Sequence, residues 1–213
     1  MSLMEEQRAF YEEIVPEQFN RLLAEQRSAS DADPNAARML EEMQAVRTSI
    51  VVQVDAGDAG QGLVRHVYDI DRGEMRLTDQ PGFAAFMILG HSLGDFPNLR
   101  RECGESLLGF LGGLAGLGEE MCLTAQRVRS LRELAGSLVF ERKGPGGFAI
   151  FASFGVDSPS PEPRATIRLD EEVYARLRAG ELDPQDAFLD GLIDLEGDLE
   201  MAVGLALAAL SPE

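Results

Sequence analysis

The stretch Gly180–Asp198, GELDPQDAFLDGLIDLEGD, decides how the C-terminal part of this chain folds. Gly180 ends the helix that precedes it, because glycine readily adopts the left-handed conformation found just after a helix. Asp183 caps a short helix that has Pro184 in its first turn. Residues 191–197 then alternate between apolar and polar side chains, which predicts a strand. Helix, short helix and strand follow each other here without a long loop.

A closing helix, DLEMAVGLALAAL, follows this stretch and is capped by Asp198. It is apolar on almost all sides, so we expect it to be buried on most of them. Small residues alternate with large ones along it. Small side chains on a buried helix leave volume unless a neighbour fills it, so the pattern fits either an apolar cavity or plain close packing.

The segment before Gly180 predicts strands and one more helix. SLVFERK and FAIFASF are joined by the turn GPGG, and RATIRLD follows a Pro-rich loop. DEEVYARLR begins with acidic residues, which the dipole favours at a helix N-terminus. Strands and helices in this order predict an α+β arrangement in which helices cover one face of a mostly antiparallel sheet.

Residues 180–188 and 191–198, in this order and at these offsets, resemble the signature of the type-two sterol carrier protein family. That signature has a helix ending in glycine, an Asx-Pro-x-x-Ala-Phe helix, a strand bracketed by two glycines and a final apolar helix. The resemblance covers about residues 130–213. It implies a sheet-and-helix fold around an apolar tunnel that takes up acyl chains, sterols or similar lipids, without covalent chemistry.

The resemblance also implies candidate ligand-binding residues. Gln185 stands where the family often directs a polar side chain toward the cavity, so we expect it to hydrogen-bond a lipid headgroup. As a group, the apolar candidates fit a cavity lining or an ordinary core equally well. They are Phe148, Ile150, Phe154, Phe188, Ile193, Leu199 and Val203.

Only about 35 residues separate Gly136 from Asp170, which looks short by one strand for this family. The missing strand is either lost or supplied by the first half of the chain. The pattern of the first half predicts two helices, three strands and a mostly helical block from Phe83 to Leu134. We expect a break between two helices in the Gly-rich middle of this block, residues 109–118. The expected elements are helices at 5–26 and 36–46 and strands at 49–55, 63–71 and 74–79.

We therefore expect three regions: N-terminal helices (1–47), an α+β region (48–129) and a sterol-carrier-like domain (130–213). The N-terminal helical and three-stranded extension is a candidate diverged repeat of the last region. Residues 76–90 can be laid over residues 168–180, since both combine a strand-end Arg-Leu with an aromatic-Ala pair and a glycine.

The charge of the chain excludes several classes of partner. Its 19 Lys and Arg face 37 Asp and Glu, a net charge of −18, which repels nucleic acid and anionic membranes alike. Residues 170–213 hold twelve carboxylates against two arginines. The N-terminus resembles no signal peptide, and the longest apolar stretch is too short to span a bilayer, so we expect a cytoplasmic protein. Cys103 and Cys122 are expected to be small buried side chains.

One string looks catalytic. Gly90-His91-Ser92-Leu93-Gly94 matches the G-x-S-x-G pattern of esterases, whose serine needs a histidine base later in the chain. The chain has only His66 and His91, and neither follows Ser92. We instead interpret the string as a helix end broken by glycines. No spacing for a metal site or a nucleotide loop is present, so the prediction is a protein without enzyme activity, metal or cofactor.

These observations favour non-enzymatic binding of a lipid or another apolar ligand in an internal cavity, with transfer as a further role left open. The alternative is an accessory or scaffolding protein that keeps the fold without a ligand and offers its acidic surface to a protein partner. A homodimer is also compatible with the sequence.

Overall fold

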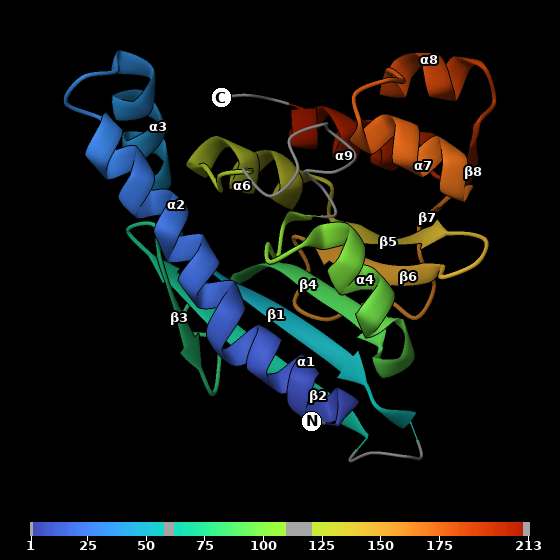
Figure 1. The fold of residues 1–213 in the computed structure, drawn as a ribbon, viewed down its shortest axis with the longest axis horizontal. Helices are drawn as coiled ribbons and strands as arrows, with labels where there is room; N and C mark the ends of the chain where they lie inside the picture. The colour runs from blue at the N-terminus through green and yellow to red at the C-terminus, as the bar shows by residue number, and fades with distance from the viewer. Residues whose placement is uncertain (1, 58–61, 110–120, 211–213) are drawn as a thin grey trace.

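The computed structural model of this chain describes residues 2–57, 62–109 and 121–210. Strands of this part form one sheet in the order β3-β2-β1-β4-β6-β5-β7-β8, and Figure 1 shows the helices packed mainly over one of its faces. The strands are β1 (Arg47–Asp55), β2 (Leu63–Asp71), β3 (Glu74–Thr78), β4 (Ala85–Ser92), β5 (Gly136–Arg142), β6 (Phe148–Phe154), β7 (Ala165–Leu169) and β8 (Ile193–Gly197). The helical elements are α1 (Leu3–Ala9), η1 (Phe10–Ile14), α2 (Val15–Ala29), α3 (Pro34–Gln44), η3 (Leu93–Asp95), α4 (Phe96–Cys103), α6 (Ala125–Glu133), α7 (Glu171–Arg178), α8 (Pro184–Leu189) and α9 (Leu199–Leu210).

Most predicted elements are confirmed. The helix expected at 5–26 is the continuous series α1, η1 and α2, and α3 is the second predicted helix. The signature stretch forms α8 and β8 between α7 and α9 as expected. The sheet is mostly antiparallel, with parallel pairing only of β1 with β4 and of β5 with β7 in the described part. The α+β class is therefore confirmed, while the predicted break at residues 109–118 lies almost entirely outside the described residues.

The first long helix contains one π-turn, η1, whose cause can be read from the chain. The Val15 amide donates to the Phe10 carbonyl, five residues back. In the same register the Tyr11 carbonyl would receive the next amide, but the next residue is Pro16, which has no amide hydrogen. The Tyr68 hydroxyl donates to the Tyr11 carbonyl instead, at 2.7 Å. A side chain of β2 thus completes the hydrogen bonding of the N-terminal helix.

Replacing Tyr68 by phenylalanine is expected to lower the free energy of unfolding by about 1–3 kcal/mol, because the buried Tyr11 carbonyl then loses its donor. Tyr174→Phe is the matched control. Its hydroxyl is also buried but has no hydrogen-bond partner among the described residues, so its removal should cost little. Urea unfolding of both variants measures the difference, and equal losses would contradict this assignment.

β4 corrects one prediction. The block from Phe83 to Leu134 was expected to be mostly helical, yet residues 85–92 form a strand between β1 and β6. Phe86 and Met87 are fully buried, and Ile88 and Leu89 are each only 5% exposed. A strand that is paired at both edges and covered on both faces is apolar throughout, so the alternation that identifies a half-buried strand is missing.

A strand of the first half pairs with a strand of the second half. β6 pairs with β5 on one side and with β4 on the other, from Met87 opposite Phe154 to Gly90 opposite Phe151. The first half therefore supplies a strand to the second, and the sheet runs without interruption through both. Each half has a first strand with an antiparallel partner on one side and a parallel one on the other: β2-β1-β4 and β6-β5-β7.

The diverged repeat stays a prediction. The shared pairing pattern matches β4 with β7, whereas the sequence overlay placed Arg76 on Arg168. Arg76 lies in the edge strand β3, and Arg168 lies in β7. The sequence overlay gave a different alignment because an Arg-Leu pair occurs near the end of both β3 and β7.

Candidate functional site

Three of the predicted ligand-binding residues lie together on the helix-covered face of the sheet. Phe148, Ile150 and Phe154 alternate along β6 and are at most 3% exposed. All three belong to the main apolar core. Ile193, at the start of β8, is half-buried and packs against the same core.

The other four predicted residues lie elsewhere. Gln185 is exposed on α8, where its backbone amide donates to the capping carboxylate of Asp183 at 2.7 Å. Phe188 on the same helix is 39% exposed, and on α9 Leu199 and Val203 are 47% and 44% exposed. The structure thus separates the candidates into a buried set on β6 and an exposed set on α8 and α9.

α9 is less buried than its composition predicted. One face of it, formed by Met201, Ala202, Leu205 and Ala208, packs into the core. Gly204 lets α9 approach α6 closely, since a Cβ atom there would come within 2.7 Å of the Leu134 side chain. The small residues of α9 therefore serve close packing against α6 and the sheet, at least along this face.

A small cavity lies instead beneath α4, where η1 meets β4 and β6. Its volume is about 30 Å³. Apolar side chains form most of its wall, and Ile150 is the one predicted residue among them. The other apolar wall residues include Phe10, Leu89, Phe96, Leu99 and Leu107. These residues could not be found from the sequence, because they come from elements far apart in the chain.

The polar end of this cavity is formed by Tyr11 and His91. His91 Nδ1 lies 2.8 Å from the Ser92 carbonyl, which can only accept, so Nδ1 carries the hydrogen and Nε2 is the acceptor. The Tyr11 hydroxyl then donates to Nε2 at 2.7 Å. Burial lowers the pKa of His91 and raises that of Tyr11, so both side chains are neutral near pH 7.

A second buried histidine lies beside this pair. His66 stacks on the Tyr11 ring at 5.1 Å between ring centres, and its Nε2 lies 2.7 Å from the Gln7 amide nitrogen. Burial, with smaller contributions from Arg8 and His91, lowers the pKa of His66 to about 4. Ser92, by contrast, uses its hydroxyl to accept the Asp95 amide at 3.1 Å, as a helix cap does. Both imidazoles are thus bonded to other side chains, and Ser92 ends a strand rather than the helix that the sequence suggested.

His66 makes the free energy of unfolding depend on pH. Below pH 6.5 the unfolded chain binds a proton at this histidine, whereas the folded chain does not until the pH approaches 4. The free energy of unfolding should therefore fall between pH 6.5 and pH 4, by roughly 3 kcal/mol from this group. Urea unfolding across this range should show a shallower dependence in His66→Gln than in the unaltered protein, and parallel curves would contradict the prediction.

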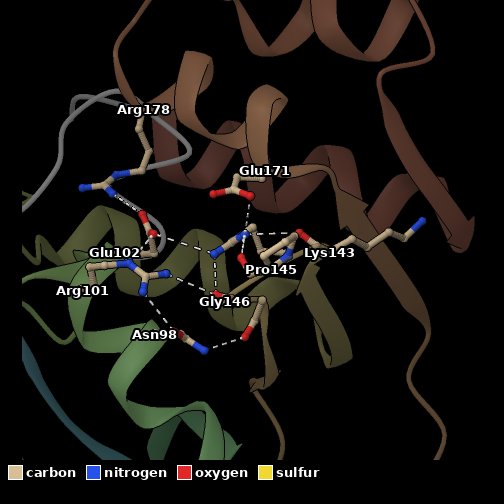
Figure 2. A network of polar contacts seen from close by, with 10 residues as sticks. Asn98, Arg101, Glu102, Lys143, Pro145, Gly146, Glu171 and Arg178 are labelled. Carbon is tan, nitrogen blue, oxygen red and sulfur yellow. Dashed lines mark hydrogen bonds and ion pairs between the residues drawn. The ribbon is translucent and has the colours of Figure 1, made fainter.

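A network of polar contacts joins the two halves beside the cavity (Figure 2). Arg142, at the end of β5, is 2% exposed and donates to the carbonyls of Lys143, Pro145 and Gly146 in the β5–β6 turn. Its guanidinium lies 3.6 Å from Glu171 of α7 and 3.9 Å from Glu102 of α4. This one side chain therefore connects the turn, α4 and α7.

α4 holds the same turn from its other side. Asn98 donates to the Gly147 carbonyl at 3.1 Å, and Arg101 donates to the Gly146 carbonyl at 3.3 Å. Glu102 also pairs with Arg178 of α7 at 2.6 Å (Figure 2). These contacts hold α4, which forms the roof of the cavity, in a defined position over the second half of the chain.

Two features are absent from the described residues. None of their helices has the length and apolar character needed to cross a bilayer. Nor do three or more His, Cys, Asp or Glu side chains gather there in a way that could hold a metal ion.

Comparison with known proteins supports the resemblance stated above. Residues 124–209 match the model of the SCP-2 sterol transfer family, while a search of curated proteins finds no match. Among solved structures, sterol carrier protein 2 like 2 from Aedes aegypti is 23% identical, with 34% of this chain and 72% of that chain covered and a TM-score of 0.28. Apo sterol carrier protein 2 from Yarrowia lipolytica is 19% identical, with 40% and 77% covered and a TM-score of 0.31.

A more distant match is the MycE methyltransferase of the mycinamycin biosynthetic pathway, which is 18% identical with a TM-score of 0.20. The match covers 47% of this chain but only 26% of the methyltransferase chain. The match of residues 124–209 confirms the resemblance predicted from the signature stretch: this region is similar to the SCP-2 sterol transfer family.

Proposed function

We propose that this protein binds an apolar, lipid-like ligand and transfers it without covalent chemistry. The observation that carries the proposal is the match of residues 124–209 to the sterol transfer family. The apolar wall of the cavity beneath α4 supports it, because each methylene removed from water contributes about 0.8 kcal/mol to binding.

The site we propose has the buried side chains of β6 as its floor. Phe148, Ile150 and Phe154 would contact the apolar part of the ligand, with Ile193 at the β8 end. The cavity beneath α4 is too small for an alkyl chain, so binding requires α4 or α9 to move away from the sheet. Gln185 and Phe188 would contact the ligand at the opening, and Leu199 and Val203 only if α9 turns.

Two measurements test ligand binding. Native mass spectrometry of the purified protein, before and after denaturing extraction, should reveal a bound lipid. A fluorescent fatty acid added to extracted protein should bind and be displaced by unlabelled lipid. A ligand at 100 times its dissociation constant should also raise the free energy of unfolding by about 2.7 kcal/mol. An apo mass combined with no fluorescent binding would contradict the proposal.

Gln185→Leu tests the headgroup contact. Because Gln185 is exposed, the variant should fold with a free energy of unfolding within about 0.5 kcal/mol of the original. The ratio of fatty acid to fatty alcohol affinity should fall, since a hydrogen bond from Gln185 to a charged carboxylate is stronger than one to a neutral hydroxyl and leucine removes both. Gln80→Leu, an exposed glutamine of the first half, is the matched control. The same ratio in both variants would remove Gln185 from the site.

A further inference from the structure

Exposed apolar side chains are concentrated in the C-terminal helices. Among the described residues, two large apolar side chains of the first half are strongly exposed, Leu63 at 57% and Leu77 at 41%. The others fall within twenty consecutive residues of α8, the turn after it and α9. They are Phe188 (39%), Leu189 (70%), Leu192 (37%), Leu199 (47%), Val203 (44%) and Leu207 (63%).

On α9 these side chains form a regular stripe. Leu199, Val203 and Leu207 are spaced by four residues and therefore lie on one face of the helix, over about 12 Å of its length. Met201 and Leu205, on the opposite face, are at most 3% exposed. Helix α8 stands at the same end of the sheet (Figure 1). We call the exposed side chains of residues 188–207 the C-terminal apolar face.

The segment that carries this face has only acidic charges of its own. No lysine or arginine follows Arg178 in the chain. Asp194, Glu196 and Asp198 are paired with Lys143, Arg168 and Arg164 of neighbouring elements. Five other exposed carboxylates among the described residues after Arg178 have no basic side chain within ion-pair distance: Glu181, Asp183, Asp186, Asp190 and Glu200.

The exposed apolar side chains and the unpaired carboxylates together indicate which kind of partner can cover the face. A second copy of the chain would bring the same carboxylates against each other, and an anionic membrane would be repelled in the same way. A helix with leucines on one side and lysines or arginines on the other would bury the apolar stripe and neutralise the free carboxylates. Amphipathic helices bind apolar grooves and faces through side chains at this spacing.

We propose that the C-terminal apolar face docks a basic amphipathic helix of a partner protein. The proposal does not depend on lipid binding. The two proposed sites share Phe188, Leu199 and Val203, so the substitutions that test docking are made at Leu189 and Leu207, which lie outside the proposed ligand site. Docking there would bring a partner to the two helices that flank the opening of the ligand site.

The test uses the full chain and two synthetic peptides of about 16 residues with the same leucine positions. One peptide carries lysine at its polar positions and the other carries glutamate. Calorimetry should detect binding of the lysine peptide alone, and the affinity should fall at least tenfold between 50 mM and 500 mM salt, where charges are screened. Equal binding of both peptides would overturn the proposal.

Substitutions locate the peptide on the surface. Leu189→Glu and Leu207→Glu change side chains that are 70% and 63% exposed, so neither should disturb the fold. Each should lower the affinity for the lysine peptide at least tenfold. Leu63→Glu, which changes a side chain of β2 that is 57% exposed, should not. An equal loss in all three variants, or none in Leu207→Glu, would overturn the proposal.

Two controls test whether a second copy of the chain or a membrane covers the face instead. Sedimentation that reveals a dimer broken by Leu207→Glu would assign the face to a second copy, and vesicles of zwitterionic lipid that bind in its place would assign it to a membrane. Either result would overturn the proposal. Displacement of the fluorescent fatty acid should be unchanged in Leu189→Glu and Leu207→Glu, so the outcome for lipid binding is read separately.

Discussion

Replacing Arg142 by methionine is expected to lower the free energy of unfolding by about 3–5 kcal/mol. Methionine fills most of the same volume, so the loss measures the polar contacts rather than a cavity. Three carbonyls of the β5–β6 turn would lose their donor, and the carboxylates of Glu102 and Glu171 would lose a buried cation. Urea unfolding followed by circular dichroism measures the change.

The neighbouring residue provides the control. Lys143 pairs with Asp194 at 3.1 Å, but both side chains are substantially exposed, 40% and 56%. Lys143→Met should therefore cost no more than about 1 kcal/mol, as exposed ion pairs usually do. If Arg142→Met cost as little as Lys143→Met, the network of Figure 2 would not be what joins α4 to the second half.

Gly197→Ala is expected to be the second large effect, a loss of at least about 3 kcal/mol. Gly197 has φ +92, which side chains rarely adopt, and an added Cβ would lie 2.3 Å from the Arg164 carbonyl oxygen. That oxygen also accepts the Asp198 amide at 2.8 Å, so the backbone cannot move away freely. The glycine that closes the signature strand is thus required by a close approach of two backbones.

Gly180→Ala distinguishes the cost of the positive φ from the cost of the close contact with Arg164. Gly180 has φ +68, also in the left-handed region, but nothing lies within 4 Å of the position where its Cβ would be. Its substitution should cost only the backbone strain, about 1–2 kcal/mol. Thermal and urea unfolding of both variants measure the difference, and equal costs would rule out the contact with Arg164 as the cause.

The structure explains which parts of the candidate site could be predicted. Phe148, Ile150 and Phe154 were placed on one face because a strand alternates its side chains, and that face is buried as expected. The exposure of Gln185 could not be predicted, because the Asp-Pro pattern that forms α8 does not say which way the helix faces. The cavity wall at Phe10, Leu89 and Phe96 had no local signal at all.

The same division applies to the fold. Capping residues, glycines and apolar spacing predicted α7, α8, β8 and α9 correctly, since these signals act between residues a few positions apart. The identity of β4 and its pairing with β6 had to come from the assembled molecule, because a central strand is recognised by neighbours distant in sequence. Long-range packing likewise left one side of α9 in solvent, although its composition suggested burial. Local chemistry sets which elements form, and the contacts between elements set which of their faces are covered.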